Sequence, residues 1–458
     1  MKSKTHAIRI ISGLMIPIVM SLGSCAVPAS DDTDQAETYS TEARLDESFV
    51  MQEATDKLTL YSYTMNSDMI TPAVNIFSEM YPDVSVDVVS LSDEEYVNLL
   101  SAELPAGKGP DLILSPTDDF GGDVYKTMNS NLFVDLNQLI LRDDEFSLDE
   151  YIENVMNAGI YKGKRYIMPI EYGLLPLVTT QEILDEEGFS ADSVQTYEGF
   201  LDAARQYNER HAGDGDKSAL SAGDTSSMLL RNFLIYGSFR LIDYEKNSVS
   251  IDETSFREVM EFIKDAPKND PPDFTDSMGA GLISRRNLFD NSLFSMKTAF
   301  ISEIARVQNS GQTPLTFMWK NADNGVTAEV INAAAIPKAS ENQVNAYRFL
   351  KILLSEEIQG GNSDGITYLR YGHPVLESSL RAQMKKDFGE SDIIGSEDEK
   401  YIDSYIDLVV GVSHASLGTP DTVEGFVEEA MSPFWDGKKS YDECCASLVS
   451  MLELYKDE

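Results

Sequence analysis

The sequence has few residues that could build a disulfide framework or a transition-metal site. Its 458 residues include three cysteines and four histidines. Cys444 and Cys445 are adjacent, and because neighbouring cysteines rarely bridge, we expect no disulfide framework. No His/Cys cluster is present, which argues against zinc or copper. The motifs of phosphate loops, nucleophile elbows, HExxH enzymes and dinucleotide-binding loops are also missing. We therefore expect no cofactor.

Basic residues are scarce relative to acidic ones. The chain has 36 Lys and Arg against 77 Asp and Glu, a formal net charge of -41. Such a surface repels nucleic acid and anionic lipid, so we exclude both as partners of the folded part. It would suit a cationic ligand or calcium, but "DGDK" and "DNG" are too short for a calcium loop. The diffuse acidity favours solubility, and whether calcium binds it stays open.

Long apolar runs are missing except near the amino end. A basic start is followed by residues 10–22, an apolar run that is short of the ~20 residues needed to span a bilayer. This layout is typical of a secretory signal peptide over residues 1–24. The stretch "LGSC" resembles the lipobox of bacterial lipoproteins, in which the cysteine becomes the acylated N-terminus. The resemblance implies a lipid anchor, palmitate for example, at Cys25.

Two alternatives to the lipoprotein remain open, an ordinary signal peptide with a chance cysteine and an N-terminal membrane helix.

Residues 25–56 are rich in Asp and Glu, with Arg44 as the lone basic residue. Such a segment cannot bury a core, so we expect an acidic flexible tether. About 400 residues remain, too many for one compact core and suited to two lobes.

Strands and helices are expected to alternate after the tether. "KLTLYSY" (57–63) and "VSVDVVSL" (84–91) read as strands, separated by a helical apolar pattern over 70–81. Ser92 and Glu95 form a capping box for the next helix, and "GPDLILSP" (109–116) reads as a further strand. The alternation predicts a parallel α/β sheet. Ligands of such sheets lie beyond the carboxyl ends of the strands, which points to loops 64–68 and 115–121.

Two later helices are also predicted from capping and periodicity. Ser340 with Gln343 should cap a helix, and Ser440 with Glu443 should cap the last one. In the last helix we expect a buried stripe of Tyr441, Cys445, Leu448 and Leu452, with Cys445 as a core residue. "INAAAIP" (331–337) reads as a buried strand between these regions.

Several stretches, in order through nearly the whole body, resemble the extracellular solute-binding proteins of ABC importers, specifically the maltose-binding-protein-like family 1. They are "FSEMYPDVSVDVV", "GKGPDLILSPTDDFGG", "NLFVDLNQLI", "YKGKRYIMPIEYG", "LFSMKTAFI", "AAAIPKASENQVNAYRFLKILLSEEIQ", "YGHPV" and "FWDGKKSYDECCASLVSMLELY". Each match alone is weak, but their common order is specific.

The resemblance implies an α/β fold of the periplasmic-binding-protein-like type II, with two α/β lobes joined by a hinge and a ligand cleft between them. It places chain crossings near Pro169, Ala328 and Tyr371. The expected segments are the signal peptide 1–24, the tether 25–56, lobe 1 at 57–168, lobe 2 at 169–328, a lobe 1 return at 329–371 and C-terminal helices of lobe 2 at 372–458.

A sugar binder needs flat aromatics for stacking and Asp, Glu, Asn or Arg for paired hydrogen bonds with hydroxyl groups. On the family pattern the candidate ligand-binding residues are Tyr63, Asn66, Asp118, Asp119, Glu171, Tyr172, Arg306, Trp319 and His414. Ser416 accompanies His414 in its loop. Asp118 is the strongest candidate, with a helix N-cap as its alternative role. Asp119 stands where the family has Arg, which puts the identity of the sugar in doubt. Trp319 could instead pack beside the hinge.

These features predict a monomeric, membrane-anchored extracellular lipoprotein that captures a small solute, expected to be an oligosaccharide, and delivers it to the membrane permease of an ABC importer. Three alternatives stay open. The solute could be a polyamine, a glycerol phosphate or a peptide, or the protein could be a ligand sensor or adhesin that is not coupled to import. A glycoside hydrolase would need two facing carboxylates, which 77 acidic residues supply by chance.

Overall fold

The computed structural model describes most of the chain after the predicted signal and tether. The described residues are 44–50, 54–117, 120, 122–213, 217–220, 226–265, 292–296, 307, 311–361, 368–369, 372–390 and 399–457. All of them belong to one compact unit, Ser40–Glu458. The predicted signal peptide and the predicted lipidation site, Cys25, lie outside the described residues.

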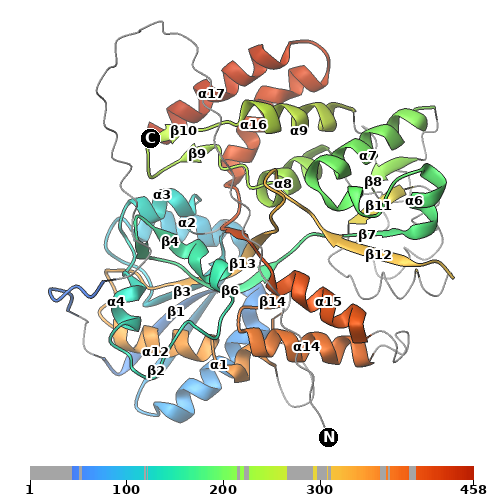
Figure 1. The fold of residues 1–458 in the computed structure, drawn as a ribbon. Coiled ribbons are helices and arrows are strands. Elements are labelled where there is room, and N and C mark those ends of the chain that lie inside the picture. The colour runs from blue at the N-terminus through green and yellow to red at the C-terminus, as the bar shows by residue number, and fades with distance from the viewer. Residues whose placement is uncertain are drawn as a thin grey trace, which may run out of the picture. The chain divides into compact units, whose positions relative to one another are not determined.

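The larger of the two main sheets has seven strands (Figure 1). Its strands run in the order β14-β6-β13-β3-β1-β2, and β15 pairs with β13. The strands are β1 (Lys57–Tyr63), β2 (Ser85–Leu91), β3 (Leu112–Pro116), β6 (Met168–Gly173), β13 (Thr327–Ala335), β14 (His373–Pro374) and β15 (His414–Ser416).

The predicted parallel arrangement of the first strands is confirmed. β1 pairs in parallel with both β2 and β3. Helix α1 (Ser67–Met80) connects β1 to β2, and α2 (Asp93–Glu103) connects β2 back to β3 across β1. Since such crossovers are right-handed, the two helices cover opposite faces of the sheet (Figure 1). Phe77 of α1 and Tyr96 of α2 are fully buried against it.

The remainder of this sheet is antiparallel where β13 meets β3 and β6, and where β14 meets β6. Short elements surround it, namely α3 (Val124–Asn129), α4 (Leu136–Ile140), α5 (Glu153–Met156), α12 (Gln343–Leu353), α13 (Glu356–Gln359), the hairpin β4 (Ile160–Tyr161) with β5 (Lys164–Arg165), and the 3-10 turns η1 (Thr64–Asn66) and η3 (Asn157–Gly159). Helix α12 packs against α1.

A second, four-stranded sheet has the strand order β12-β7-β11-β8. Its strands are β7 (Pro176–Thr180), β8 (Ser218–Leu220), β11 (Ser292–Met296) and β12 (Pro314–Met318). The helices of the same region are α6 (Gln181–Glu187), η4 (Ser193–Gln195), α7 (Tyr197–Arg210), α8 (Ser226–Tyr236) and α9 (Glu253–Asp265). The region also contains the hairpin of β9 (Ile242–Asp243) and β10 (Ser248–Val249). The chain enters this sheet directly from β6 through Leu174 and Leu175, and returns through β13 (Figure 1).

Four helices complete the chain: α14 (Glu377–Glu390), α15 (Glu399–Val410), α16 (Asp421–Trp435) and α17 (Tyr441–Asp457). α16 packs against α8, α9 and α17, whereas α14 packs against β14. The predicted capping of α17 is confirmed, because Ser440 Oγ lies 2.8 Å from the Glu443 carboxylate and Glu443 N–H donates to Ser440.

Two local predictions were wrong. The buried cysteine of α17 is Cys444, whereas Cys445 is only partly buried, because the buried stripe follows Tyr441, Cys444 and Leu448 at a spacing of three and four residues. Helix α12 starts at Gln343 behind Asn342 and does not use Ser340 as its cap. The Ser340 hydroxyl is instead engaged with the Asp111 carboxylate at 2.7 Å.

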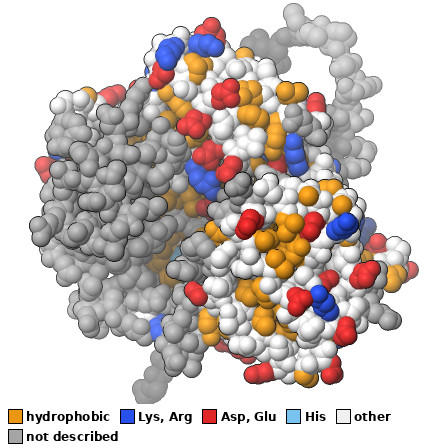
Figure 2. Space-filling view, turned by 180° about the vertical axis from the view of Figure 1, so that it is seen from behind, with side chains coloured by type: hydrophobic (Ala, Val, Ile, Leu, Met, Phe, Trp, Pro, Cys, Tyr) orange, Lys and Arg blue, Asp and Glu red, His pale blue; other side chains and the backbone are white. Residues whose placement is uncertain are grey.

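The acidic surface is diffuse. On the face shown in Figure 2, Asp and Glu side chains are scattered among apolar and polar ones over the described atoms. The described residues contain no group of three or more His, Cys, Asp or Glu arranged to hold a metal ion. None of the helices in this part of the chain combines the length and apolar composition of a membrane span.

Candidate ligand-binding site

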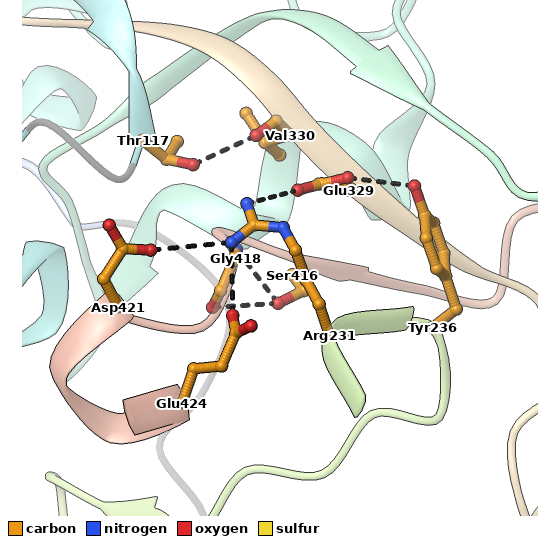
Figure 3. Close-up of polar contacts among 9 residues, drawn as sticks. All are labelled: Thr117, Arg231, Tyr236, Glu329, Val330, Ser416, Gly418, Asp421 and Glu424. Carbon is orange, nitrogen blue, oxygen red and sulfur yellow. Dashed lines mark hydrogen bonds and ion pairs between the residues drawn. The ribbon is translucent and has the colours of Figure 1, made fainter. Parts of the chain in front are cut away.

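Polar side chains from both sheet regions meet around β13, the strand by which the chain returns to the large sheet (Figure 3). Thr117 follows β3 and donates its hydroxyl hydrogen bond to the Val330 carbonyl at 3.1 Å. Glu329, the neighbour of Val330, is in register with Gly173 of β6 on one side and with Ser416 of β15 on the other. The ends of β3, β6 and β15 therefore converge on two consecutive residues of β13.

Arg231 of α8 is the centre of this convergence, as Figure 3 shows. Its guanidinium lies 3.7 Å from the Glu329 carboxylate, 3.6 Å from Asp421 and 3.3 Å from Glu424. Tyr236, five residues further along α8, donates to the other Glu329 oxygen at 2.9 Å. We call Arg231, Tyr236, Glu329, Asp421 and Glu424 the Arg231 cluster.

The Arg231 cluster is partly open to solvent. The Arg231 side chain is 34% exposed and that of Asp421 is 85% exposed, whereas Tyr236 is buried. Burial, together with the neighbouring Glu329 carboxylate, raises the pKa of Tyr236 well above its ordinary value. Its hydroxyl therefore remains a hydrogen-bond donor throughout the physiological pH range.

The chemistry of the Arg231 cluster suits a ligand rich in hydroxyl groups. Its guanidinium supplies donors, its three carboxylates supply acceptors, and paired donors and acceptors can bind neighbouring hydroxyl groups. The acids outnumber the base, so a positively charged group on a ligand would also be accommodated.

Several predicted site residues lie next to this cluster. Tyr172 on β6 pairs with Val330, and His414 on β15 pairs with Thr327, two residues before Glu329. The Tyr172 side chain is buried and donates to the Val409 carbonyl at 3.2 Å. The His414 ring is exposed, with Nδ1 3.3 Å from the Asn321 amide. Asp118 and Asp119 directly follow Thr117 and lie outside the described residues, as does Arg306.

Other predicted residues are engaged in internal contacts. Glu171 is 1% exposed and accepts from Asn332 Nδ2 at 2.7 Å and from the Gly372 N–H. Asn66 is buried, and its side chain donates to the Leu114 carbonyl, which holds the turn after β1 against β3. Tyr63 is partly buried at the end of β1. Their roles in ligand binding stay predictions.

Trp319 occupies an apolar position. It is 2% exposed, with its ring centroid 5.0 Å from that of Phe200 and 4.7 Å from that of Phe233. This packing matches the alternative role that the sequence left open for Trp319, and stacking on a ligand stays a prediction. Trp435, at the end of α16, donates to the Met260 carbonyl at 3.1 Å.

The sequence reasoning missed Arg231 and Glu329, although both carried a signal. Each is a lone charge in an apolar element, "SSMLLRNFLIY" for α8 and "TAEVINAAA" for β13. Charged side chains inside apolar segments are rarely buried without a partner, so this pattern predicts an oppositely charged partner for each of them. The partners were not visible because Glu424 lies 193 residues after Arg231.

Comparison with solved structures identifies the fold. The sugar-binding protein MalE from Xanthomonas citri shares the fold with a TM-score of 0.63 and 13% identity, over 88% of this chain and 97% of that one. A periplasmic oligogalacturonide binding protein from Yersinia enterocolitica matches with a TM-score of 0.58 and 13% identity, over 88% of this chain and 99% of that one. A substrate-binding protein from Listeria monocytogenes in complex with cycloalternan matches with a TM-score of 0.54 and 13% identity, over 87% of this chain and 98% of that one. The fold is thus the predicted α/β type II periplasmic-binding-protein fold.

The model of the family described as bacterial extracellular solute-binding protein matches residues 73–388, and the chain belongs to this family. The family resemblance read from the sequence is confirmed, and the family places the protein outside the cytoplasm. A curated relative, the arabinooligosaccharide-binding protein of Halalkalibacterium halodurans, is 28% identical over 149 residues. That match covers 31% of this chain and 31% of the relative, about a third of its length.

Proposed function

We propose that this protein captures an oligosaccharide between its two sheet regions and delivers it to the permease of an ABC importer. The observation that carries the proposal is the Arg231 cluster, in which α8 of the second region, the return strand β13 and the start of α16 present hydrogen-bonding groups at one place. A ligand that bridges these elements favours the conformation in which they are close, which is hinge closure.

The names of the relatives support a carbohydrate. One is an arabinooligosaccharide-binding protein, and the fold neighbours include binders of sugars and oligogalacturonides. The protein acts in this proposal as a binder without catalysis, in monomeric form. It is held at the outer face of the cell membrane through acylated Cys25, and the acidic residues between Cys25 and Arg44 serve as a spacer.

One specific observation supports a second candidate solute. The Arg231 cluster contains three carboxylates and one guanidinium, so a polyamine or an amino sugar would gain Coulombic stabilisation there. Such binding would weaken steeply with salt if its contacts are exposed, whereas hydroxyl recognition would change little.

A ligand screen tests the proposal. The chain from Ala26 onward is scanned for melting temperature with arabino-, malto- and galacturono-oligosaccharides, polyamines, glycerol phosphates and peptides. The bound solute should raise the melting temperature by several degrees at saturating concentration. If none of the oligosaccharides or polyamines raises it, the proposal of a solute site at the Arg231 cluster fails, whatever the glycerol phosphates do. Chromatography after a long incubation should recover the oligosaccharide intact, and release of shorter sugars would contradict the assignment as a binder.

Variants then locate the site by calorimetry. Arg231→Gln and Asp118→Ala should each weaken binding of the solute by roughly 1–3 kcal/mol, because each removes hydrogen bonds to hydroxyl groups in a partly dry site. Arg205→Gln, a surface arginine paired with Asp202 on α7, is the matched control and should bind normally. Unchanged affinity of Arg231→Gln would move the site away from the cluster.

A further inference from the structure

A pocket that shares no lining residue with the Arg231 cluster lies where residues 44–50 meet the folded body. Its volume is about 460 Å³, within the range of small-molecule sites. One wall is the segment 44–50, which is docked on the body: Asp46 N–H donates to Gln138 Oε1 at 2.7 Å and Gln138 Nε2 donates to the Arg44 carbonyl at 2.8 Å. The opposite walls include Lys162, Lys164, Lys338 and Gln343. We call this the lysine pocket.

The charge of the lysine pocket contrasts with the rest of the molecule. Three lysines and Arg44 line it in a chain whose net charge is -41. Its two acids, Asp135 and Asp46, accept hydrogen bonds from the backbone of Arg165 and Asn137 and from Ser48, and they offset two of its four positive charges. Lys162 Nζ donates to Asn129. Within the described part of the chain, no ion pair is formed by Lys164 or Lys338.

The like charges of Lys164 and Lys338 oppose each other. Burial, followed by the charge of Lys164, lowers the pKa of Lys338 below its ordinary value, and the attraction of Asp135 only partly opposes this shift. An anion placed between two ammonium groups would remove this repulsion and gain attraction from both. The geometry of the pocket therefore favours a bound negative group.

Gln343 adds a second, independent feature. Its side chain is 6% exposed, and its amide nitrogen donates to the Lys338 carbonyl at 3.3 Å. Its oxygen is buried and finds no hydrogen-bond donor among the described residues. A buried acceptor without a partner costs free energy, and a ligand hydroxyl would satisfy it.

We propose that the lysine pocket binds a phosphate ester that also carries a hydroxyl group. Lys164 and Lys338 contact the phosphate, and Gln343 accepts the hydroxyl hydrogen. Phosphate is favoured over carboxylate because lysine ammonium groups are point charges without the planar fork that matches a carboxylate. A phosphate monoester also carries about -1.5 to -2 charges at pH 7, which suits several cations. This proposal is independent of the oligosaccharide function.

The chemistry has two possible sources, a free organic phosphate or the headgroup of a lipid. Calorimetry with the chain from Ala26 onward, which contains every described residue, uses sn-glycerol 3-phosphate, inorganic phosphate and glycerate. A second arm measures co-sedimentation with vesicles of phosphatidylglycerol and with vesicles of phosphatidylcholine alone. We expect one glycerol 3-phosphate per chain, bound more tightly than inorganic phosphate and at least tenfold more tightly than glycerate.

Variants assign the contacts. The double change Lys164→Gln and Lys338→Gln should weaken glycerol 3-phosphate binding at least tenfold. Gln343→Leu should weaken glycerol 3-phosphate and leave inorganic phosphate unchanged. The matched control, Lys108→Gln with Lys439→Gln, removes two exposed lysines elsewhere and should bind normally. If the source is a lipid headgroup, phosphatidylglycerol vesicles bind the wild type and lose the double variant, whereas a free organic phosphate binds without vesicle association.

Three results would overturn the proposal. They are the absence of binding to every phosphate probe and vesicle, equal binding by the double variant, and glycerate binding as tight as that of glycerol 3-phosphate. Oligosaccharide binding by the double variant, measured in parallel, should match that of the wild type. Failure of the lysine pocket is therefore distinguishable from failure of the oligosaccharide proposal.

Discussion

His373 is a titratable residue on β14, the strand at one edge of the large sheet. It lies on β14 opposite Tyr172 of β6, with ring centroids 5.6 Å apart. Burial lowers the pKa of His373 from 6.5 to about 4. The neutral imidazole is therefore the form that the folded state accepts.

The stability of the protein should depend on this residue below neutral pH. Between pH 6.5 and 4 the unfolded chain binds a proton at His373 that the folded chain does not, so stability falls as the pH falls through this range. From pH 7 to pH 5 the loss should be about 1–2 kcal/mol of unfolding free energy. Urea unfolding of wild type and His373→Gln at both pH values measures it. An equal pH dependence in both proteins would contradict the assignment.

At the residue scale, the residue types in the sequence indicated which side chains could bind a ligand. They did not indicate which of these side chains lie close together in the fold. Asp118 was selected by a family motif, whereas Arg231 and Glu329 were missed despite being lone charges in apolar segments. Trp319 was a stacking candidate from its chemistry, yet it packs against Phe200 and Phe233. Burial of an aromatic depends on distant neighbours, so composition could not separate the two roles.

At the scale of elements, α3 connects the large sheet to the C-terminal helix. Asp123 caps α3 by accepting from the backbone of Tyr125 and Lys126. The same carboxylate accepts from the Tyr455 hydroxyl of α17 at 2.9 Å and from the hydroxyl of Tyr244, the residue after β9. One buried side chain thus stabilises a helix start and two contacts with the second region.

Replacing Asp123 should separate these roles. Asp123→Ala removes the cap and both tyrosine contacts and should cost about 2–3 kcal/mol of unfolding free energy. Asp123→Asn keeps the cap and weakens only the charged hydrogen bonds, so it should cost about 1 kcal/mol. Tyr455→Phe is the control for a single hydroxyl. Urea denaturation compares them, and equal losses for Ala and Asn would refute the capping role.

Elements were predicted well where a local signal defines them. β1 was predicted at 57–63 and is found there, and the Ser92–Glu95 capping box before α2 is confirmed. The predictions failed where two nearby residues offered the same signal. Ser340 stands two residues before the actual cap of α12, and Cys444 and Cys445 differ only in which one faces the core. A shift of one residue turns a helix position by about 100°.

At the scale of the whole protein, membrane attachment does not follow from the structure of the folded body. Our proposal assigns it to Cys25. One acyl chain binds a membrane only marginally, whereas two or more hold a protein firmly, so loss of the acylated cysteine should release it.

Fractionation of bacterial cells tests the anchor. Wild type should sediment with membranes and incorporate labelled palmitate, whereas Cys25→Ala should lose the label and enter the soluble extracytoplasmic fraction. The control that replaces Cys444 and Cys445 with Ala should behave as wild type. Retention of Cys25→Ala in membranes would instead support an N-terminal membrane helix.

Contiguous residues were sufficient for the signals that are local in nature. They encode the order of strands and helices, the signal-like amino end, and the series of motifs that identifies an extracellular solute-binding protein. These signals are carried by spacing and residue type within a few turns of chain.

Folding alone brought together the groups that the proposals use. Arg231 meets Glu424 across 193 residues, and Arg44 meets Gln138 across 94, to form the Arg231 cluster and one wall of the lysine pocket. Such pairs depend on how elements pack and on which way each side chain then points. Neither is written in the spacing of neighbouring residues, because tertiary contacts are set by the burial of apolar surface over the whole chain.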